Sequence, residues 1–244
     1  MSFSLPASFY DGVNGGAYAP YADDLANECF PKAAIPVREV LDLGCGTGAI
    51  CALLAKRGYD MTGLDSSLEM LSAAYERNAG LNTLLLAQDM REFELYGTVQ
   101  AVYSSFDCLN YILTARDLKK VFALVRNYLE PGGIFAFDVN TLYRYKEVFD
   151  GRSYVYESGG DLLIWRSAAS KTGSVCEFTL DFFTRGKDGS YERGTETQKQ
   201  RFHSEKTLRA AAVGFELLEK SGGKGFDGCA ANEKDYYVFR RIRK

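Results

Sequence analysis

The sequence predicts an α/β fold, a doubly wound and mostly parallel sheet into which an antiparallel β meander is inserted. Between residues 38 and 138, short apolar runs alternate with helical patterns at the spacing of parallel strands and crossover helices. Between 150 and 202, aromatic and β-branched runs are separated by glycine-containing hairpin signals instead. A chain of 244 residues can build one such domain with a modest insert.

Composition narrows the functional classes. The net charge of −3 gives no global positive field for nucleic acid, so a nucleic-acid partner is not expected. Six cysteines without a C-x-x-C pair indicate a reducing compartment and no metal site. We find no secretory signal and no apolar run approaching the roughly 20 residues that cross a bilayer. We therefore expect a cytoplasmic protein without a membrane partner.

Residues 1–37 are predicted to form an N-terminal arm or lid. Asn14, Gly15 and Gly16 indicate a turn or mobile loop, and residues 21–30 a short helix. Tyr10 and Tyr18 flank these glycines, which suggests a flap over a ligand. An arm whose rings simply pack on the core is an equally good interpretation.

From residue 38 onward the elements follow in regular order. A strand at 38–43 leads through three glycines into a helix at 48–57. Ser66 and Glu69 form a predicted capping box, and Thr114 and Ser204 are predicted N-caps. The further strands are predicted at 60–64, 84–87, 100–103, 134–138, 215–219 and 236–240. The core is thus expected at 38–149 and 203–244, with the insert at 150–202 covering the cleft.

The residues at the strand ends carry the functional pattern, because ligands of open α/β sheets bind outside the carboxyl ends of the strands. The glycines of Gly44–Gly48 let a ligand lie against bare main chain. Asp65 can accept both hydroxyls of a ribose. Asp89 can accept from the exocyclic amine of adenine, with Met70 and Met90 as soft walls. Together these features predict a nucleotide-type site.

Charge helps to choose the nucleotide. Gly44, Gly46 and Ala49 also satisfy the dinucleotide pattern G-x-G-x-x-A, so glycine spacing alone leaves two cofactor classes open. Asp42 lies two residues before the first glycine, where its charge disfavours a pyrophosphate and favours an ammonium or sulfonium. S-adenosylmethionine carries both cations, an adenine and a ribose, and no phosphate.

The stretch Val40–Gly48, with Asp65, Gln88-Asp89-Met90 and Pro131-Gly132-Gly133, resembles the motifs of class I S-adenosylmethionine-dependent methyltransferases. The arm and the insert after strand 5 resemble the small-molecule branch of that family. The resemblance implies a seven-stranded sheet in the order 3-2-1-4-5-7-6 with an antiparallel last strand. It implies that the cofactor is bound by Tyr18, Asp42, Gly44, Cys45, Gly46, Gly48, Asp65, Ser66, Met70, Gln88, Asp89, Met90, Ser104 and Ser105.

The expected activity is methyl transfer from S-adenosylmethionine to nitrogen or oxygen of a small-molecule acceptor, by in-line displacement. No catalytic residue is fixed by the sequence; Tyr10, Asp138 and His203 are candidates among the groups expected to face the cleft. The end of strand 4 lacks the Asn/Asp-Pro-Pro-Tyr/Phe motif, which disfavours DNA adenine and glutamine acceptors. Alternatives are a non-catalytic S-adenosylmethionine-binding protein, a tRNA methyltransferase or a dinucleotide-dependent oxidoreductase. Monomer and homodimer both stay open.

Overall fold

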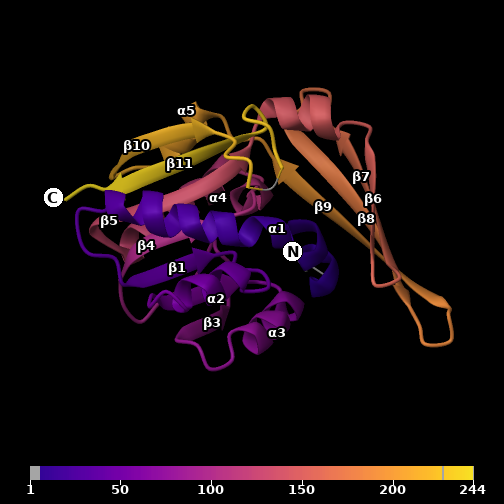
Figure 1. Ribbon diagram of the computed structural model, residues 1–244. Coiled ribbons are helices and arrows are strands. Elements are labelled where there is room, and N and C mark those ends of the chain that lie inside the picture. Colours follow the sequence, from indigo (N-terminus) through magenta and orange to yellow (C-terminus); the bar gives the residue numbers. More distant parts are fainter. Residues whose placement is uncertain (1–5, 227, 244) are drawn as a thin grey trace.

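The structure is a computed structural model that describes residues 6–226 and 228–243. Its centre is a seven-stranded sheet in the order β10-β11-β5-β4-β1-β2-β3 (Figure 1). The strands are β1 Glu39–Leu43, β2 Asp60–Asp65, β3 Thr83–Ala87, β4 Val99–Ser104, β5 Leu129–Asn140, β10 Phe215–Gly222 and β11 Lys234–Arg241. β10 and β11 are the sixth and seventh strands of the core, and β11 is antiparallel to β5. The predicted order and the antiparallel last strand are confirmed.

Helices cover both faces of the sheet. α1 Ala7–Asp24, α2 Ala49–Ala55 and α3 Leu68–Arg77 pack on one face, and α4 Ala115–Tyr128 and α5 Glu205–Ala211 on the other. Side chains alternate along each strand, so Phe135 and Phe137 of β5 join the core with α4 while Ile134 and Ala136 join the core with α1. Four short helices complete the core: Leu25–Cys29, Phe30–Lys32, Cys108–Tyr111 and Arg144–Phe149.

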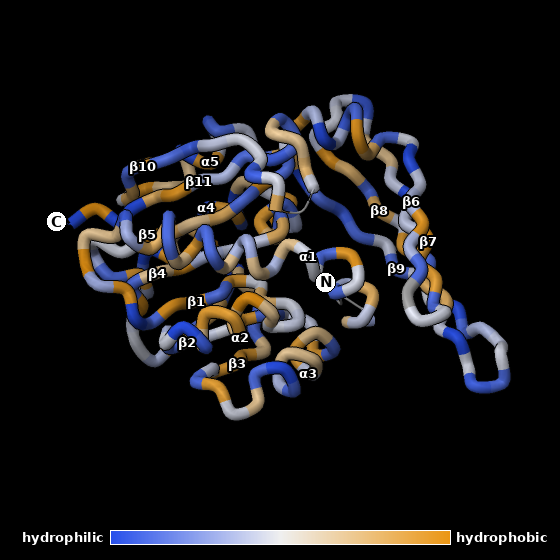
Figure 2. The backbone as a smooth tube through the Cα atoms, viewed as in Figure 1, coloured by the Kyte–Doolittle hydropathy of each residue, from blue (hydrophilic) through white to orange (hydrophobic). Residues whose placement is uncertain are grey.

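The insert forms a second, antiparallel sheet in chain order. Its strands are β6 Ser153–Ser158, β7 Asp161–Ala169, β8 Val175–Arg185 and β9 Tyr191–Arg201. The sheet leans away from the core, and the N-terminal end of α1 lies between the two (Figure 1). Phe9 of α1 packs against Leu163 and Leu180 of the insert. Apolar segments concentrate in the core strands, whereas the tip of the β8–β9 hairpin is hydrophilic (Figure 2).

The N-terminal arm differs from the prediction. The expected turn at residues 14–16 is helical, and α1 begins at Ala7 rather than at residue 21. Each glycine costs about 1 kcal/mol in a helix relative to alanine. The helix nevertheless buries Phe9 and Tyr21, and a Cβ atom at Gly15 or Gly16 would meet nothing within 4 Å. Burial of one face therefore outweighs the local preference of the glycines.

The cap of α3 is also corrected. Ser67, not Ser66, is the N-cap, and its Oγ accepts from the backbone N–H of Met70 at 3.3 Å. Asp65 Oδ1 in turn accepts from the N–H of Ser67 at 2.9 Å, which fixes the turn one residue later than predicted. The predicted caps Thr114 and Ser204 are confirmed. Within the described residues, no helix is long and apolar enough to cross a membrane.

Candidate active site

The loop after β1 is held against β2 by its own backbone. The N–H groups of Gly44 and Cys45 donate to the carbonyl of Leu64 at 2.8 and 2.9 Å, and that of Gly46 donates to Asp65 Oδ2 at 2.9 Å. A Cβ atom on Gly44, where φ is +93°, would lie 2.8 Å from the sulfur of Cys108. The loop thus needs glycine to pass this close to the chain after β4.

A cavity of about 260 Å³ opens beside this loop; we call it the cofactor cavity. It contains eight of the predicted cofactor residues, namely Gly44, Gly46, Asp65, Ser66, Met70, Gln88, Asp89 and Met90. Burial raises the pKa of Asp65, although the backbone N–H groups of Ser67 and Gly46 favour its charged form. The Asp89 carboxylate is paired with Arg91, whose hydrogen bonds lower the pKa of Asp89.

Asp42 lies beneath the loop rather than in the cavity lining. Its Oδ2 accepts from the hydroxyl of Tyr103 at 2.6 Å and from the thiol of Cys51 at 3.3 Å. Its Oδ1 is buried and has no hydrogen-bond partner among the described residues. Burial raises the pKa of Asp42 to about 7, and the Tyr103 hydrogen bond opposes this only in part. A buried oxygen without a donor fits a cationic ligand at the loop.

The other predicted cofactor residues lie outside the cavity lining: Tyr18, Cys45, Gly48, Ser104 and Ser105. Ser104 is fully buried and donates to the carbonyl of Leu43 at 2.7 Å. Gly48 faces α3, because a Cβ atom there would lie 2.6 Å from Asn78. The Tyr18 hydroxyl donates to Asp11 at 2.8 Å. These residues shape the loop and its surroundings.

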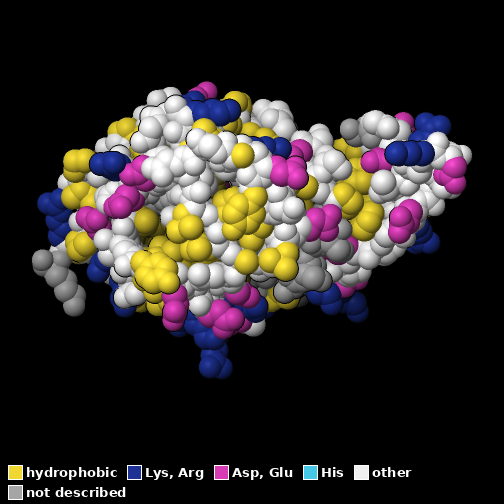
Figure 3. All heavy atoms as spheres, turned by 90° about the horizontal axis from the view of Figure 1, so that it is seen from below, with side chains coloured by type: hydrophobic (Ala, Val, Ile, Leu, Met, Phe, Trp, Pro, Cys, Tyr) yellow, Lys and Arg dark blue, Asp and Glu magenta, His cyan; other side chains and the backbone are white. Residues whose placement is uncertain are grey.

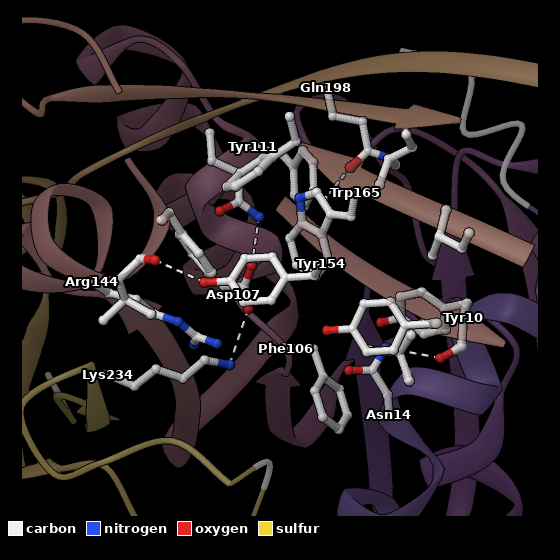
Figure 4. A pocket seen from close by; sticks show the side chains of 18 residues that line it. Tyr10, Asn14, Phe106, Asp107, Tyr111, Arg144, Tyr154, Trp165, Gln198 and Lys234 are labelled. Carbon is white, nitrogen blue, oxygen red and sulfur yellow. Dashed lines mark hydrogen bonds and ion pairs between the residues drawn. The ribbon is translucent and has the colours of Figure 1, made fainter. Parts of the chain in front are cut away.

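A second cavity, of about 400 Å³, adjoins the first; we call it the acceptor cavity (Figure 4). Tyr10, Phe106 and Tyr111 line both cavities. The rest of the acceptor-cavity lining comes from α1, the turn after β4, the helix Arg144–Phe149, the insert strands and the start of β11. It consists of Val13, Asn14, Asp107, Arg144, Val148, Phe149, Tyr154, Tyr156, Leu163, Trp165, Phe178, Leu180, Gln198, Gln200 and Lys234.

Charged groups gather at one end of the acceptor cavity. Figure 4 shows Arg144 and Lys234 close together there, opposite Tyr10 and Asn14. The Lys234 ammonium lies 3.0 Å from Asp107 Oδ1 and 2.9 Å from Asp138 Oδ2. At the top of the cavity, Nε1 of Trp165 is buried and donates to none of the described groups. A ligand oxygen could accept from it.

The three catalytic candidates occupy different places. Tyr10 lines both cavities, and burial raises its pKa well above its ordinary value. Asp138 is fully buried behind Lys234 and is not in either lining. His203 lines neither cavity; its Nε2 is 3.1 Å from the carbonyl of Leu109, and burial lowers its pKa.

Sequence reasoning did not single out Arg144, Trp165 or Lys234. Arg144 and Lys234 stand outside the strand-end pattern, and Trp165 is one of many aromatics in the insert. Trp165 is the single tryptophan of the sequence, and this was the signal that could have drawn attention to it. Within residues 6–226 and 228–243, no cluster of acidic, cysteine and histidine side chains could hold a metal ion.

Known proteins resemble this chain in sequence and in fold. A family model described as a methyltransferase domain matches residues 40–133. The chain is 35% identical to the putative methyltransferase YqeM of Bacillus subtilis, over 80% of this chain and 78% of that one. It is 35% identical over 52% of each chain to dTDP-3-amino-3,4,6-trideoxy-alpha-D-glucopyranose N,N-dimethyltransferase of Streptomyces venezuelae. A crystal structure of an S-adenosylmethionine-dependent methyltransferase from Clostridium acetobutylicum superposes with a TM-score of 0.84 at 25% identity, covering 97% of this chain and 98% of that one.

Proposed function

The chain belongs to the class I S-adenosylmethionine-dependent methyltransferases, and from this premise we propose that it methylates the nitrogen of a small-molecule amine. The predicted activity and cofactor class are confirmed by these relatives. They favour S-adenosylmethionine over the dinucleotide that the glycine spacing left open.

One observation carries the proposal: two adjoining cavities share the rings of Tyr10, Phe106 and Tyr111. Eight of the fourteen predicted cofactor residues line the first cavity, so we assign Asp65 to the ribose and Asp89 with Met90 to the adenine. The unpartnered oxygen of Asp42 supports a cationic group at the loop. When bound, S-adenosylmethionine supplies a methyl group activated by a sulfonium. The acceptor would lie in the second cavity, across the shared rings.

The arm and the insert would exclude water from the reacting atoms. α1 contributes Tyr10, Val13 and Asn14 to the acceptor cavity, and the insert contributes most of its remaining wall. Holding the acceptor nitrogen in line and removing water are the main tasks of an enzyme with an already activated donor. We therefore propose that residues 1–37 act as a lid and residues 150–202 as a cover.

The charges favour an amine over an oxygen acceptor. The lining holds one acid, Asp107, and two cations, Arg144 and Lys234. Asp138 and Glu233 pair with these cations from behind the lining, so acids outnumber cations by three to two in the cluster as a whole. An excess of carboxylate attracts a positively charged amine. Two relatives, from Streptomyces venezuelae and Streptomyces fradiae, are named as amino-sugar N,N-dimethyltransferases, which supports nitrogen as the acceptor atom.

Formation of S-adenosylhomocysteine from a panel of amines, phenols and carboxylic acids tests the proposal. We expect turnover with at least one amine. Val13→Trp would fill the acceptor cavity without touching the cofactor cavity. This variant should bind S-adenosylmethionine with wild-type affinity in isothermal titration and lose at least tenfold in acceptor turnover.

Two outcomes would overturn the proposal. Turnover confined to phenols or acids would remove nitrogen as the acceptor atom. Undiminished turnover by a folded Val13→Trp protein would remove the second cavity as the acceptor site. Turnover of tRNA with a steep salt dependence would instead support the RNA-modifying alternative.

A further inference from the structure

We infer that Asp107 binds the ammonium group of the acceptor and receives its proton, so that the substrates are basic alkyl amines. Lys234 and Asp138 are positioning residues that hold Asp107 in place. The inference rests on the proposed amine methylation and names the substrate class of that site.

Phe106 and Asp107 have φ angles of 53° and 54°, and they are the only described non-glycine residues with positive φ. Left-handed conformations are unfavourable for residues with a Cβ atom, and they persist where surrounding contacts impose them. Here the N–H of Asp107 donates to Asp138 Oδ2 at 2.9 Å. Asp138 Oδ1 in turn accepts from the hydroxyl of Tyr21 at 2.8 Å, which ties the turn to α1.

This backbone places the Asp107 side chain in the wall of the acceptor cavity (Figure 4). Its side chain is 20% exposed, compared with 2% for Lys234 and 0% for Asp138. Asp107 is therefore the most exposed member of the cluster, although Lys234 also lines the cavity. Gln200 of β9 donates to its Oδ2 at 2.5 Å, so the insert also holds the carboxylate. A carboxylate has about four acceptor positions, which leaves room for a ligand donor.

The charge of the cluster selects the ligand. Two carboxylates, Asp107 and Asp138, face the Lys234 ammonium. Arg144 lines the same cavity and is offset by Glu233 at 3.7 Å, so the five groups together have an excess of one negative charge. An opposite charge within a few ångströms is favourable in such surroundings, whereas a neutral hydroxyl gains much less. The cavity should thus discriminate an alkylammonium from an alcohol of the same shape.

The proton has a defined route. The ammonium of the acceptor gives one proton to the Asp107 carboxylate and becomes a neutral amine with a lone pair. The nitrogen–carbon bond then forms as the methyl–sulfur bond breaks, and the electron pair of that bond stays on sulfur. The product is again an ammonium, and Asp107 releases its proton to water. One proton is released for each methyl group transferred.

Binding without turnover tests the inference. We would titrate cyclohexylamine and cyclohexanol, which match in shape, into the protein loaded with S-adenosylhomocysteine at pH 7. A hydrogen bond to a charged group predicts that the wild type prefers the amine by about 10- to 100-fold. Asp107→Asn should lose this preference and bind cyclohexanol as before. Asp188→Asn, at the exposed tip of the β8–β9 hairpin, is the matched control and should keep it.

Kinetics give a second readout with any amine that is turned over. Loss of a proton acceptor should lower kcat/KM of Asp107→Asn by about 100-fold at pH 7. Part of the loss should return as the pH approaches about 10, where alkyl amines become neutral in solution. A merely structural role would give no such return at high pH.

Two results would overturn the inference: a wild type that does not prefer the amine, or an Asp107→Asn protein that keeps the preference. The wild-type titration decides even if the variant does not fold. If the preference is present but no amine is methylated, the proposed reaction fails while the binding role of Asp107 stands.

Discussion

Asp42 is expected to be protonated in the empty protein and ionised when S-adenosylmethionine is bound. Burial raises the pKa of Asp42 to about 7, and its Oδ1 has no partner among the described residues. A cationic ligand at the loop favours the charged carboxylate and so lowers this pKa. Binding must then release a proton at pH values below about 7 and above the lowered pKa of Asp42 in the complex.

The magnitude follows from linkage between binding and ionisation. Below the pKa of the empty protein, each unit of pH costs about 1.4 kcal/mol, or a factor of ten in affinity. Because half of the Asp42 carboxyls are already ionised at pH 7, the affinity should fall by about 15-fold between pH 7 and pH 5.5. Above about pH 8 the α-amino group of the cofactor itself loses its charge, so the informative window lies below that value.

The stability of the empty fold depends on pH in the opposite direction to the affinity for S-adenosylmethionine. The pKa of Asp42 in the folded chain, about 7, is above its ordinary value of 3.8. The folded state therefore favours the protonated carboxyl, and this contribution to the stability of the empty protein is lost as the pH rises from about 4 through 7. S-adenosylmethionine should accordingly stabilise the protein more at pH 7 than at pH 5.5.

Isothermal titration at pH 5.5 and pH 7, in two buffers of different ionisation enthalpy, measures both the affinity and the proton release. Asp42→Asn should flatten the pH dependence of the affinity. Asp60→Asn, at the N-terminal end of β2, should keep that pH dependence. A wild-type affinity that changes less than threefold between the two values, with no proton released, would refute the reasoning.

Three further variants test single contacts. Asp65→Asn removes the charged acceptor at the cofactor cavity and should weaken S-adenosylmethionine binding by about 10- to 100-fold in isothermal titration, whereas Asp60→Asn should not. Asp11→Asn breaks the bonds that tie α1 to α3 and the glycine loop, and should lower the urea unfolding free energy by about 1 kcal/mol and speed proteolysis of α1. Gly48→Ala puts a Cβ atom 2.9 Å from the Cβ of a neighbouring alanine in α3, and should cost about 1–3 kcal/mol more than Gly58→Ala, where φ is also positive but the space is open. Equal stability of the two alanine variants would contradict the packing described at the loop.

The sequence predicted those parts of the molecule whose position follows from local periodicity. Asp65 is the last residue of β2 and Asp89 follows β3 by two residues, and parallel strands place such residues at one edge of the sheet. The glycine loop was predictable for the same reason, because it directly follows the first strand. The strand order could be inferred only through the family resemblance, because periodicity does not say which strands are neighbours.

The acceptor side could not be predicted in the same way. Lys234 and Trp165 are far apart in the sequence and line the same cavity only through the packing of β11 and the insert. The arm was mispredicted because the glycines of α1 oppose a helix locally, while the burial of Phe9 and Tyr21 is a tertiary effect. Local propensity therefore failed where long-range contacts decide.

A crystal structure with S-adenosylhomocysteine and an amine that is turned over would test the central claim most directly. The account predicts the ribose on Asp65, the sulfur beside Tyr10, Phe106 and Tyr111, and the acceptor nitrogen within hydrogen-bond distance of Asp107. An amine bound outside the acceptor cavity, or a sulfur turned away from the three rings, would contradict it.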